Sequence, residues 1–114
     1  MKQFVHLHLH TEYSLLDGAT RIDEMLSKCK QLNMPAVAVT DHGNMYCAWK
    51  FLNAAKNAGI KPIIGCEFYV CENLHGVGYE NKEYFHLILL AKNNVGYYNL
   101  CRLNSIAWVE GFYY

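Results

Sequence analysis

The chain has 114 residues, of which 53% are hydrophobic and 18% are charged, so it can bury a core and is not expected to be disordered. Ten basic and ten acidic side chains cancel, so the net charge gives no sign of binding to a nucleic acid or an anionic membrane. We expect no signal peptide and no membrane span, because no apolar run approaches the roughly 20 residues of a spanning helix. Five cysteines without a C-x-x-C pair favour a reducing, cytoplasmic compartment.

The beginning of the chain predicts a strand, a loop and a helix in that order. Alternating residue character predicts the strand over residues 3–9, and an Asp-Gly pair marks a turn in the loop over residues 11–19. Thr20 is expected to start the helix and to form a capping box with Asp23. The buried stripe of this helix is expected to comprise Ile22, Met25, Leu26, Cys29 and Leu32.

The middle of the chain predicts a second strand and a second helix. A continuous apolar run over residues 36–40 is typical of a short strand that is covered on both faces. The helix is expected over residues 45–58, and Gly59 suits the left-handed residue that ends it. The inward positions of this helix, taken from helical spacing, are Trp49, Leu52, Ala55 and Ala58.

Two more strands and a third helix complete the expected elements. Residues 63–70 predict another buried strand, residues 72–83 an exposed loop or hairpin turn, and residues 84–91 a fourth strand. Asn93 or Asn94 is expected to cap the third helix. The inward residues of that helix would be Tyr97, Leu100, Cys101, Leu103 and Ile106. This order of elements predicts an α/β fold with a mainly parallel sheet.

Three histidines share one face of the first predicted strand. His6, His8 and His10 alternate with apolar residues, and residues two apart on a strand lie roughly 6.6 Å apart. Neighbouring imidazoles can therefore reach one ion or two adjacent ions, and imidazole is the commonest metal ligand in proteins. A solvated sheet face or an affinity tag would also account for three histidines in such a run. The interleaved β-forming residues disfavour a tag.

Further metal-capable side chains come at or near the ends of the other predicted strands, and the carboxyl ends of parallel strands share one edge of a sheet. The predicted ligand set is His8, His10, Asp17, His42, Glu67 and His86. A mixed set of imidazoles and carboxylates suits two or three Zn²⁺, Mn²⁺ or Fe ions. Paired ions about 3.5–4 Å apart serve phosphoester hydrolysis.

Several of these residues also fit structural roles. Asp17 precedes a glycine, as an ordinary turn residue does, and Asp41 could cap the next helix or hold the imidazole of the residue that follows it. His6 shares the histidine face but lies deeper in the strand, so it is an additional candidate ligand. His86 also fits a hydrogen-bonded core residue. Glu67 lies in an apolar strand and therefore requires a partner.

Four motifs follow one another along the chain: His8-Leu9-His10-Thr11, Tyr13-Ser14-Leu15-Leu16-Asp17-Gly18, Ala38-Val39-Thr40-Asp41-His42-Gly43 and Ile64-Gly65-Cys66-Glu67. Together they resemble the polymerase and histidinol phosphatase (PHP) domain family. The segments over residues 86–93 and 110–114 resemble the branch of this family that begins the DNA polymerase III alpha subunits of bacteria.

The resemblance implies a distorted, TIM-like β/α barrel with three metal ions at the carboxyl ends of its strands, bound here by the six residues named above. The remaining ligands of the family, a cysteine or histidine and an Asp-x-His pair, come later in the domain, and no Asp-x-His follows residue 86. We therefore expect residues 1–114 to be the first part of a PHP domain, with four strands and three helices. Such a chain would end before the barrel closes and would be inactive alone.

The resemblance also implies a DNA-directed DNA polymerase as the parent protein. Its PHP domain would be a metal-dependent 3′–5′ proofreading nuclease or a scaffold that docks a separate exonuclease. The expected partners are DNA and the other polymerase subunits, and Mg²⁺ would serve the polymerase domain. A free-standing phosphatase for a small phosphate monoester, similar to a histidinol phosphatase, and a purely structural module are the alternatives. Unpaired apolar strands further predict that the chain alone self-associates.

Overall fold

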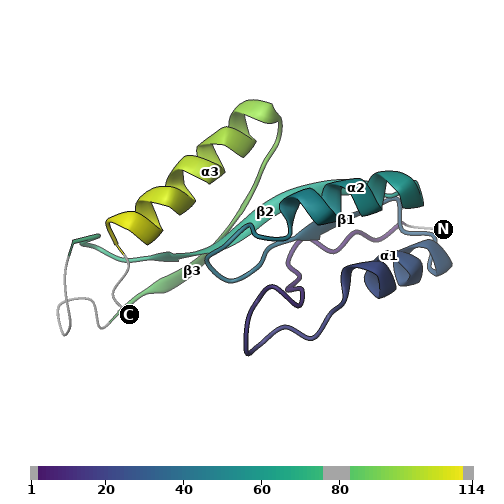
Figure 1. The fold of residues 1–114 in the computed structure, drawn as a ribbon, viewed down its shortest axis with the longest axis horizontal. Helices are drawn as coiled ribbons and strands as arrows, with labels where there is room; N and C mark the ends of the chain where they lie inside the picture. The colour runs from purple at the N-terminus through teal and green to yellow at the C-terminus, as the bar shows by residue number, and fades with distance from the viewer. Residues whose placement is uncertain (1–2, 76–82, 112–114) are drawn as a thin grey trace.

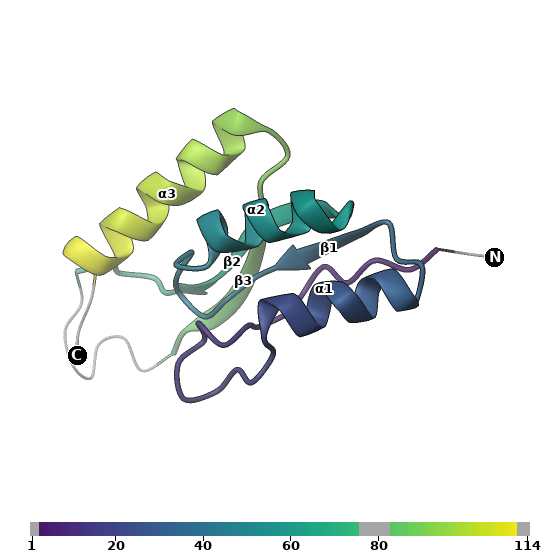
Figure 2. The same cartoon turned by 45° about the vertical axis from the view of Figure 1, so that its right-hand side comes forward.

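The computed structural model describes residues 3–75 and 83–111. Figures 1 and 2 show two helices alongside the first strand, whereas the third helix lies further along the sheet, over its paired second and third strands. The elements in chain order are α1 (Ile22–Gln31), β1 (Ala36–Val39), α2 (Ala48–Ala58), β2 (Lys61–Val70), β3 (Phe85–Leu90) and α3 (Asn94–Val109).

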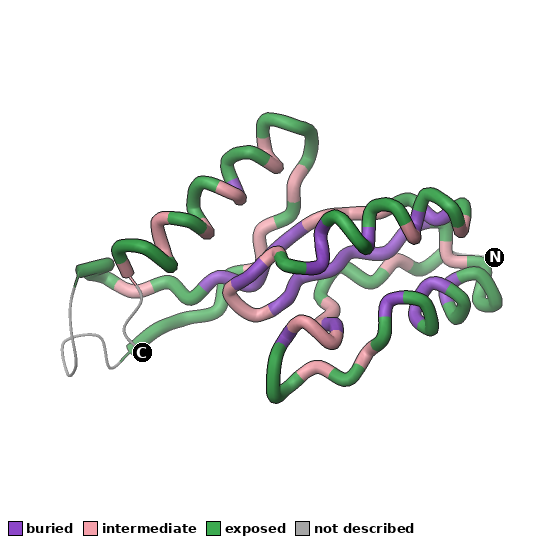
Figure 3. The backbone as a smooth tube through the Cα atoms, viewed as in Figure 1, coloured by how far each residue is buried: buried purple, intermediate pink, exposed green. Residues whose placement is uncertain are grey.

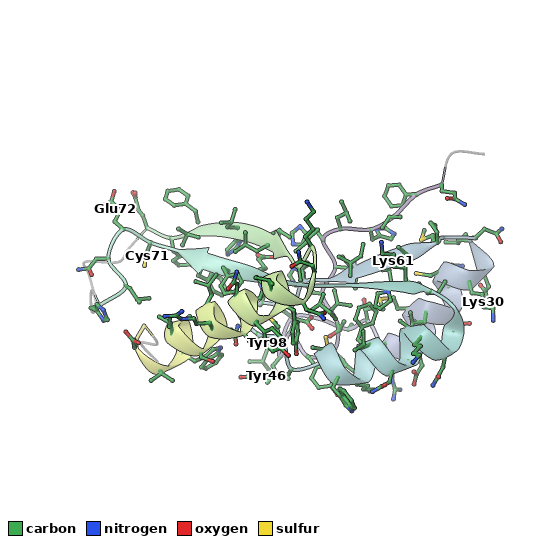
Figure 4. The ribbon with its side chains drawn as sticks, turned by 90° about the horizontal axis from the view of Figure 1, so that it is seen from above. Lys30, Tyr46, Lys61, Cys71, Glu72 and Tyr98 are labelled. Carbon is green, nitrogen blue, oxygen red and sulfur yellow. The ribbon has the colours of Figure 1, made fainter. Side chains whose placement is uncertain are left out.

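The three strands form one mixed sheet in the order β1-β2-β3. β1 and β2 are parallel, with Ala36 beside Lys61, whereas β2 and β3 are antiparallel. Figure 4 shows β2 crossing the molecule from Lys61 toward Cys71. The predicted α/β class is confirmed, and the antiparallel β3 fits the hairpin alternative for residues 72–83. Residues 76–82 of that segment lie outside the described residues.

Residues 3–9 do not form a regular strand, so the predicted first strand is wrong and the described residues hold three strands instead of four. The segment still lies along β1, because Ala38 donates a backbone hydrogen bond to His6 (2.8 Å). Thr40 donates a second such bond to Leu9 (2.8 Å). The donors lie two positions apart in the sequence, whereas the acceptors lie three positions apart. This mismatch interrupts the ladder, as a β-bulge does, and breaks the alternation of side chains.

The main core lies where α1 and α2 pack beside each other against β1. Figure 3 shows buried residues along β1 and along one side of α1. Leu32, predicted to be buried, follows the last helical residue and is 54% exposed, because the chain turns at the left-handed Asn33 (φ 54°). The other four residues of the predicted stripe are buried, as expected: Ile22, Met25, Leu26 and Cys29.

The inward face of α2 matches the prediction only in part. Ala55 is buried and Ala58 is half-buried, as predicted. Phe51 and Ala48 are also buried, whereas Trp49 is 76% exposed and Leu52 is 42% exposed, so these two predicted inward positions are wrong. Apolar residues occupy adjacent positions in this helix, so helical spacing alone does not fix its rotation. The full burial of the large Phe51 ring fixes it. The helix ends at Gly59 in the left-handed region (φ 72°), as predicted.

The starts of α1 and α2 differ from the prediction. α1 begins after Arg21, which forms no side-chain capping bond, so the capping box of Thr20 and Asp23 is wrong. The backbone oxygen of Thr20 instead accepts a hydrogen bond from the 11–19 loop. α2 begins later than predicted, at residue 48. α3 begins as predicted, because the side chain of Asn93 accepts a hydrogen bond from the Gly96 N–H (3.0 Å).

A second, smaller core joins α3 to β2. Leu100 packs there with Cys66 and Phe68, and it is the only buried residue in the described part of α3. Leu103 is 45% exposed, so its predicted inward position is wrong. Three other predicted inward residues are half-buried: Tyr97, Cys101 and Ile106. The contact between α3 and the sheet is therefore shallow.

Strand alternation separates the two faces of β2. Cys66 and Phe68 pack toward α3, so Glu67 and Tyr69 point to the opposite face. That face carries the polar site described below. Within residues 3–75 and 83–111, no helix combines the length and the apolar character needed to cross a bilayer.

We propose that the isolated chain self-associates through the outer edge of β3. No strand pairs with that edge among the described residues, and Phe85 and Leu87 on it are 67% and 46% exposed. Unpaired apolar edges favour pairing with another chain. Light scattering over tens of micromolar should show a mass that rises with concentration. Leu87→Lys should weaken this rise, whereas Leu32→Lys, at an exposed position after α1, should not. A constant monomer mass would contradict the proposal.

Candidate metal centre

The site is built around Glu67, which is 2% exposed although it lies in an otherwise apolar strand. The chain that follows β1 continues alongside β2 at this point. The N–H of Glu67 donates to the oxygen of Asp41 (3.1 Å), and the N–H of Gly43 donates to the oxygen of Glu67 (2.9 Å). These bonds hold the loop that carries His42 against Glu67.

Four imidazole rings surround the Glu67 carboxylate. The Nε2 atoms of His8 and His10 lie 2.6 and 2.9 Å from Oε2. The Nδ1 atoms of His86 and His42 lie 3.0 and 3.5 Å from Oε1. Each carboxylate oxygen therefore faces two rings. Every ion-pair partner of Glu67 in the described part of the chain is a histidine.

Asp17 reaches the cluster from the 11–19 loop. Its Oδ2 is hydrogen-bonded to Nε2 of His42, and its side chain is 64% exposed. The loop comes back on itself at Gly18, where a Cβ would lie 1.9 Å from the carbonyl oxygen of Thr11. Only glycine fits this close approach. The Asp-Gly turn predicted from sequence therefore has a steric reason, and it delivers Asp17 to His42.

His86 reaches the cluster because β3 is antiparallel. It pairs with Tyr69, two residues beyond Glu67 on β2. The beginning of an antiparallel strand lies beside the end of its neighbour, so His86 arrives at the same edge as the other rings. Its side chain is 51% exposed, so the alternative of a core residue is wrong.

Asp41 supports the cluster through hydrogen bonds with the loop that follows His10. Its carboxylate is 1% exposed and accepts hydrogen bonds from the N–H and Oγ1 of Thr11 and from Oγ of Ser14. Ser14 Oγ in turn lies 3.3 Å from Nδ1 of His10 and accepts a hydrogen bond from the N–H of His42 (3.1 Å). Asp41 thus orients His10 through Ser14. In the described structure it neither caps α2 nor holds the ring of His42.

His10 and His42 stack with their ring centroids 3.9 Å apart and their planes 8° apart. Burial, followed by the neighbouring charge of His42, lowers the pKa of His10. A lowered pKa keeps the imidazole neutral near pH 7. A neutral imidazole has a nitrogen lone pair that can bind a metal.

Tyr69 is a member of the site that the motifs do not predict. Its hydroxyl lies 3.2 Å from Nδ1 of His42, and its ring centroid lies 5.1 Å from that of His86. Tyr69 follows Glu67 by two residues in the same strand, so the two side chains share a face. That spacing is the signal by which the sequence could have identified it.

Two side chains next to the cluster in sequence stand apart from it. His6 is exposed and packs edge-on against Phe4 (4.8 Å between centroids), and it is not among the histidines paired with Glu67. Cys66 points to the helical side of β2, where burial raises the pKa of its thiol to about 12. The thiol is therefore protonated at neutral pH, which removes it as a ready metal ligand.

The donor atoms have the spacing and the chemistry of a metal site. His8, His10 and Glu67 each offer one donor atom, and these atoms lie within 4.8 Å of one another. Two ligands of a tetrahedral zinc ion lie about 3.3 Å apart at the usual metal–ligand distances. The Nε2 atoms of His8 and His10 are 3.1 Å apart. The residues present therefore fit a bound metal ion.

Comparison with known proteins relates the chain to one domain family. The PHP domain matches residues 6–114. A Borreliella burgdorferi protein named DNA polymerase III subunit alpha is 52% identical over 98% of this chain and 10% of its own length. A Helicobacter pylori protein with the same name is 54% identical over 99% of this chain and 9% of its own length. The chain thus spans about a tenth of the length of these relatives.

Two solved structures share the fold. One is a Bifidobacterium adolescentis protein proposed to be a metal-dependent phosphoesterase, with a TM-score of 0.63, 17% identity, and coverage of 88% of this chain and 32% of its own. The other is an amidohydrolase from Chromobacterium violaceum with bound sulfate and no metal, with a TM-score of 0.60, 22% identity, and coverage of 86% and 32%. At these identities the likeness concerns the fold alone.

Replacing Asp41 with asparagine should destabilise the chain. Asparagine places an amide NH₂ where Asp41 accepts hydrogen bonds, so at least one donor of the loop loses its partner, at a cost of about 2–3 kcal/mol. Asp23→Asn, at an exposed position in the first turn of α1, should cost only about 0.5 kcal/mol. Urea unfolding measures both free energies. Equal losses would show that Asp41 does not support the loop.

Proposed function

Because the chain belongs to the PHP domain family, we propose that it forms the metal-binding amino-terminal part of a PHP domain in a bacterial DNA polymerase III alpha subunit. In this proposal residues 1–114 constitute the first part of the domain. The observation that carries the proposal is the convergence of four imidazoles on the two oxygens of the buried Glu67.

The proposed metals are Zn²⁺, Mn²⁺ or Fe, with two or three ions in the complete domain. Glu67 presents each of its two oxygens to a different pair of rings, and Asp17 meets a further nitrogen of His42. The cluster contains six donor residues, whereas a single tetrahedral ion has four ligands, so more than one ion can be bound. The proposed ligands are His8, His10, Asp17, His42, Glu67 and His86.

The activity proposed for the complete domain, and not for residues 1–114 alone, is hydrolysis of the 3′-terminal phosphodiester of DNA in the 3′–5′ direction. Such ions, when bound, polarise a phosphoryl oxygen and make hydroxide available at neutral pH. The side chains of the chain itself keep the donors in place, because Asp41 holds Ser14 and Ser14 holds Nδ1 of His10. Tyr69 is 49% exposed beside His42, where its hydroxyl can donate a hydrogen bond to a phosphate oxygen.

Two rival functions are less well supported. A scaffold that only docks a separate exonuclease does not need intact metal ligands, yet the six ligands that the family has in this part of the domain are all present. A free-standing phosphatase for small phosphate monoesters is disfavoured, because relatives at 52% and 54% identity carry the name of a DNA polymerase subunit.

For the complete protein we propose DNA-directed DNA polymerase activity, with Mg²⁺ in the polymerase domain. The proposed partners are DNA and the other subunits of the replicative polymerase, and the proposed location is the cytoplasm. These proposals rest on the names of the relatives.

His8→Ala should lower the affinity of the chain for Zn²⁺ or Mn²⁺ by at least about 10-fold, because it removes a donor next to Glu67. His6→Ala is the matched control, since His6 lies two residues earlier in the same segment and is not paired with Glu67. Equilibrium dialysis followed by elemental analysis measures both affinities. The proposal would fail if the wild-type chain retained no ion, or if the two variants lost affinity equally.

A further inference from the structure

One backbone oxygen beside the cluster accepts hydrogen bonds from two side chains of α3. Nδ2 of Asn104 lies 3.0 Å from the carbonyl oxygen of Gly43, and Nε1 of Trp108 lies 2.7 Å from the same oxygen. Asn104 and Trp108 are four residues apart in α3, so they share one face of the helix. A carbonyl oxygen has two lone pairs, and these two donors use both of them.

Gly43 occupies a constrained position in the loop. Its φ of 58° lies in the left-handed region, and a Cβ there would meet the ring of Tyr69 at 3.2 Å. Its N–H donates to the backbone oxygen of Glu67 (2.9 Å). Gly43 is therefore held on one side by β2 and on the other side by α3. The residue directly before it is His42, which lies in the cluster.

The apolar packing of α3 is too shallow to fix the helix by itself. Leu100 is its only buried residue among those described. In the carboxyl-terminal half of α3, Nδ2 of Asn104 lies 3.8 Å from the sulfur of Cys66. Tyr46, labelled in Figure 4, lies beside α3, and its ring centroid is 6.4 Å from that of Trp108. The two hydrogen bonds to Gly43 are thus a main attachment of the carboxyl-terminal half of α3.

We infer that Asn104 and Trp108 are positioning residues for the metal centre. They clamp Gly43 and thereby set the backbone from which His42 projects. The inference rests on the proposed metal site, and it gives α3 a role there that none of the sequence motifs indicates. Coupling of this kind is reciprocal, so an ion bound at His42 stabilises the docking of α3 in turn.

The test measures the affinity of the 114-residue chain for Co²⁺, whose visible spectrum reports on its ligands. Asn104→Ala and Trp108→Phe each remove one hydrogen bond and should weaken binding about 2- to 10-fold, and the double variant should weaken it further. Asn99→Ala, at an exposed position on the same helix, is the matched control and should leave the affinity unchanged. Circular dichroism confirms that each variant is folded.

The same substitutions are then made in a His42→Ala background. Because the clamp acts through His42, their effect on Co²⁺ affinity should disappear there. A merely structural contribution of α3 would lower the affinity equally in both backgrounds, and that result would overturn the inference.

A second readout uses the reciprocal effect. Binding of Zn²⁺ should slow solvent exchange of the Trp108 indole proton several-fold, as seen by NMR. Trp49, 76% exposed in α2, is the internal control. Unchanged exchange at Trp108 would contradict the coupling. If the wild-type chain binds the ion and the Asn104→Ala and Trp108→Phe variants bind it with the same affinity, the inference is refuted but the proposed metal site is not. A wild-type chain that binds no ion refutes the proposed metal site and the inference with it.

Discussion

The burial of the Glu67 carboxylate is the constraint on which the rest of the site depends. Removing an ionised carboxylate from water costs on the order of several kcal/mol unless hydrogen bonds or opposite charges compensate it. Histidines from three separate segments supply this compensation by contacting both carboxylate oxygens. These segments are residues 8–10, 42 and 86. Without a cation these rings compete as donors to one carboxylate. A metal ion uses the same nitrogens and oxygens as ligands.

A layer of hydrogen bonds beneath the donors turns this convergence into a fixed geometry. Asp41 fastens the loop at Thr11 and Ser14, and Ser14 contacts both the ring of His10 and the backbone of His42. No buried polar side-chain atom among the described residues lacks a hydrogen-bond partner. The groups that support the metal-binding side chains are therefore themselves held in place by hydrogen bonds. Metal centres require such support around their ligands.

The place of Glu67 in the cluster could be predicted from sequence, because a carboxylate in an apolar strand is costly without a partner. Glu67 in an apolar strand needed a partner, and the structure supplies it with histidines. The strand alternation proposed for His6, His8 and His10 was a poorer guide, because the mismatch in backbone pairing along β1 breaks it. His6 shares the spacing of the other two but not their contact with Glu67.

Other features depend on contacts that a linear pattern does not contain. The rotation of α2 is decided by the full burial of Phe51, although Trp49 and Leu52 fit helical spacing equally well. The place of His86 depends on the antiparallel direction of β3. The direction of β3 also brings His86 into contact with Tyr69. Tyr69 belongs to the site because of its contacts in the structure, and no sequence motif contains it.

X-ray absorption spectroscopy of the Zn²⁺-loaded chain identifies the atoms bound to the ion. We expect nitrogen and oxygen ligands alone, at about 2.0–2.2 Å, with the scattering pattern of several imidazoles. No sulfur ligand is expected, because the thiol of Cys66 is buried on the other face of β2 and has a raised pKa. A sulfur shell at about 2.3 Å, or a spectrum without imidazole scattering, would show that the histidines around Glu67 are not the metal ligands.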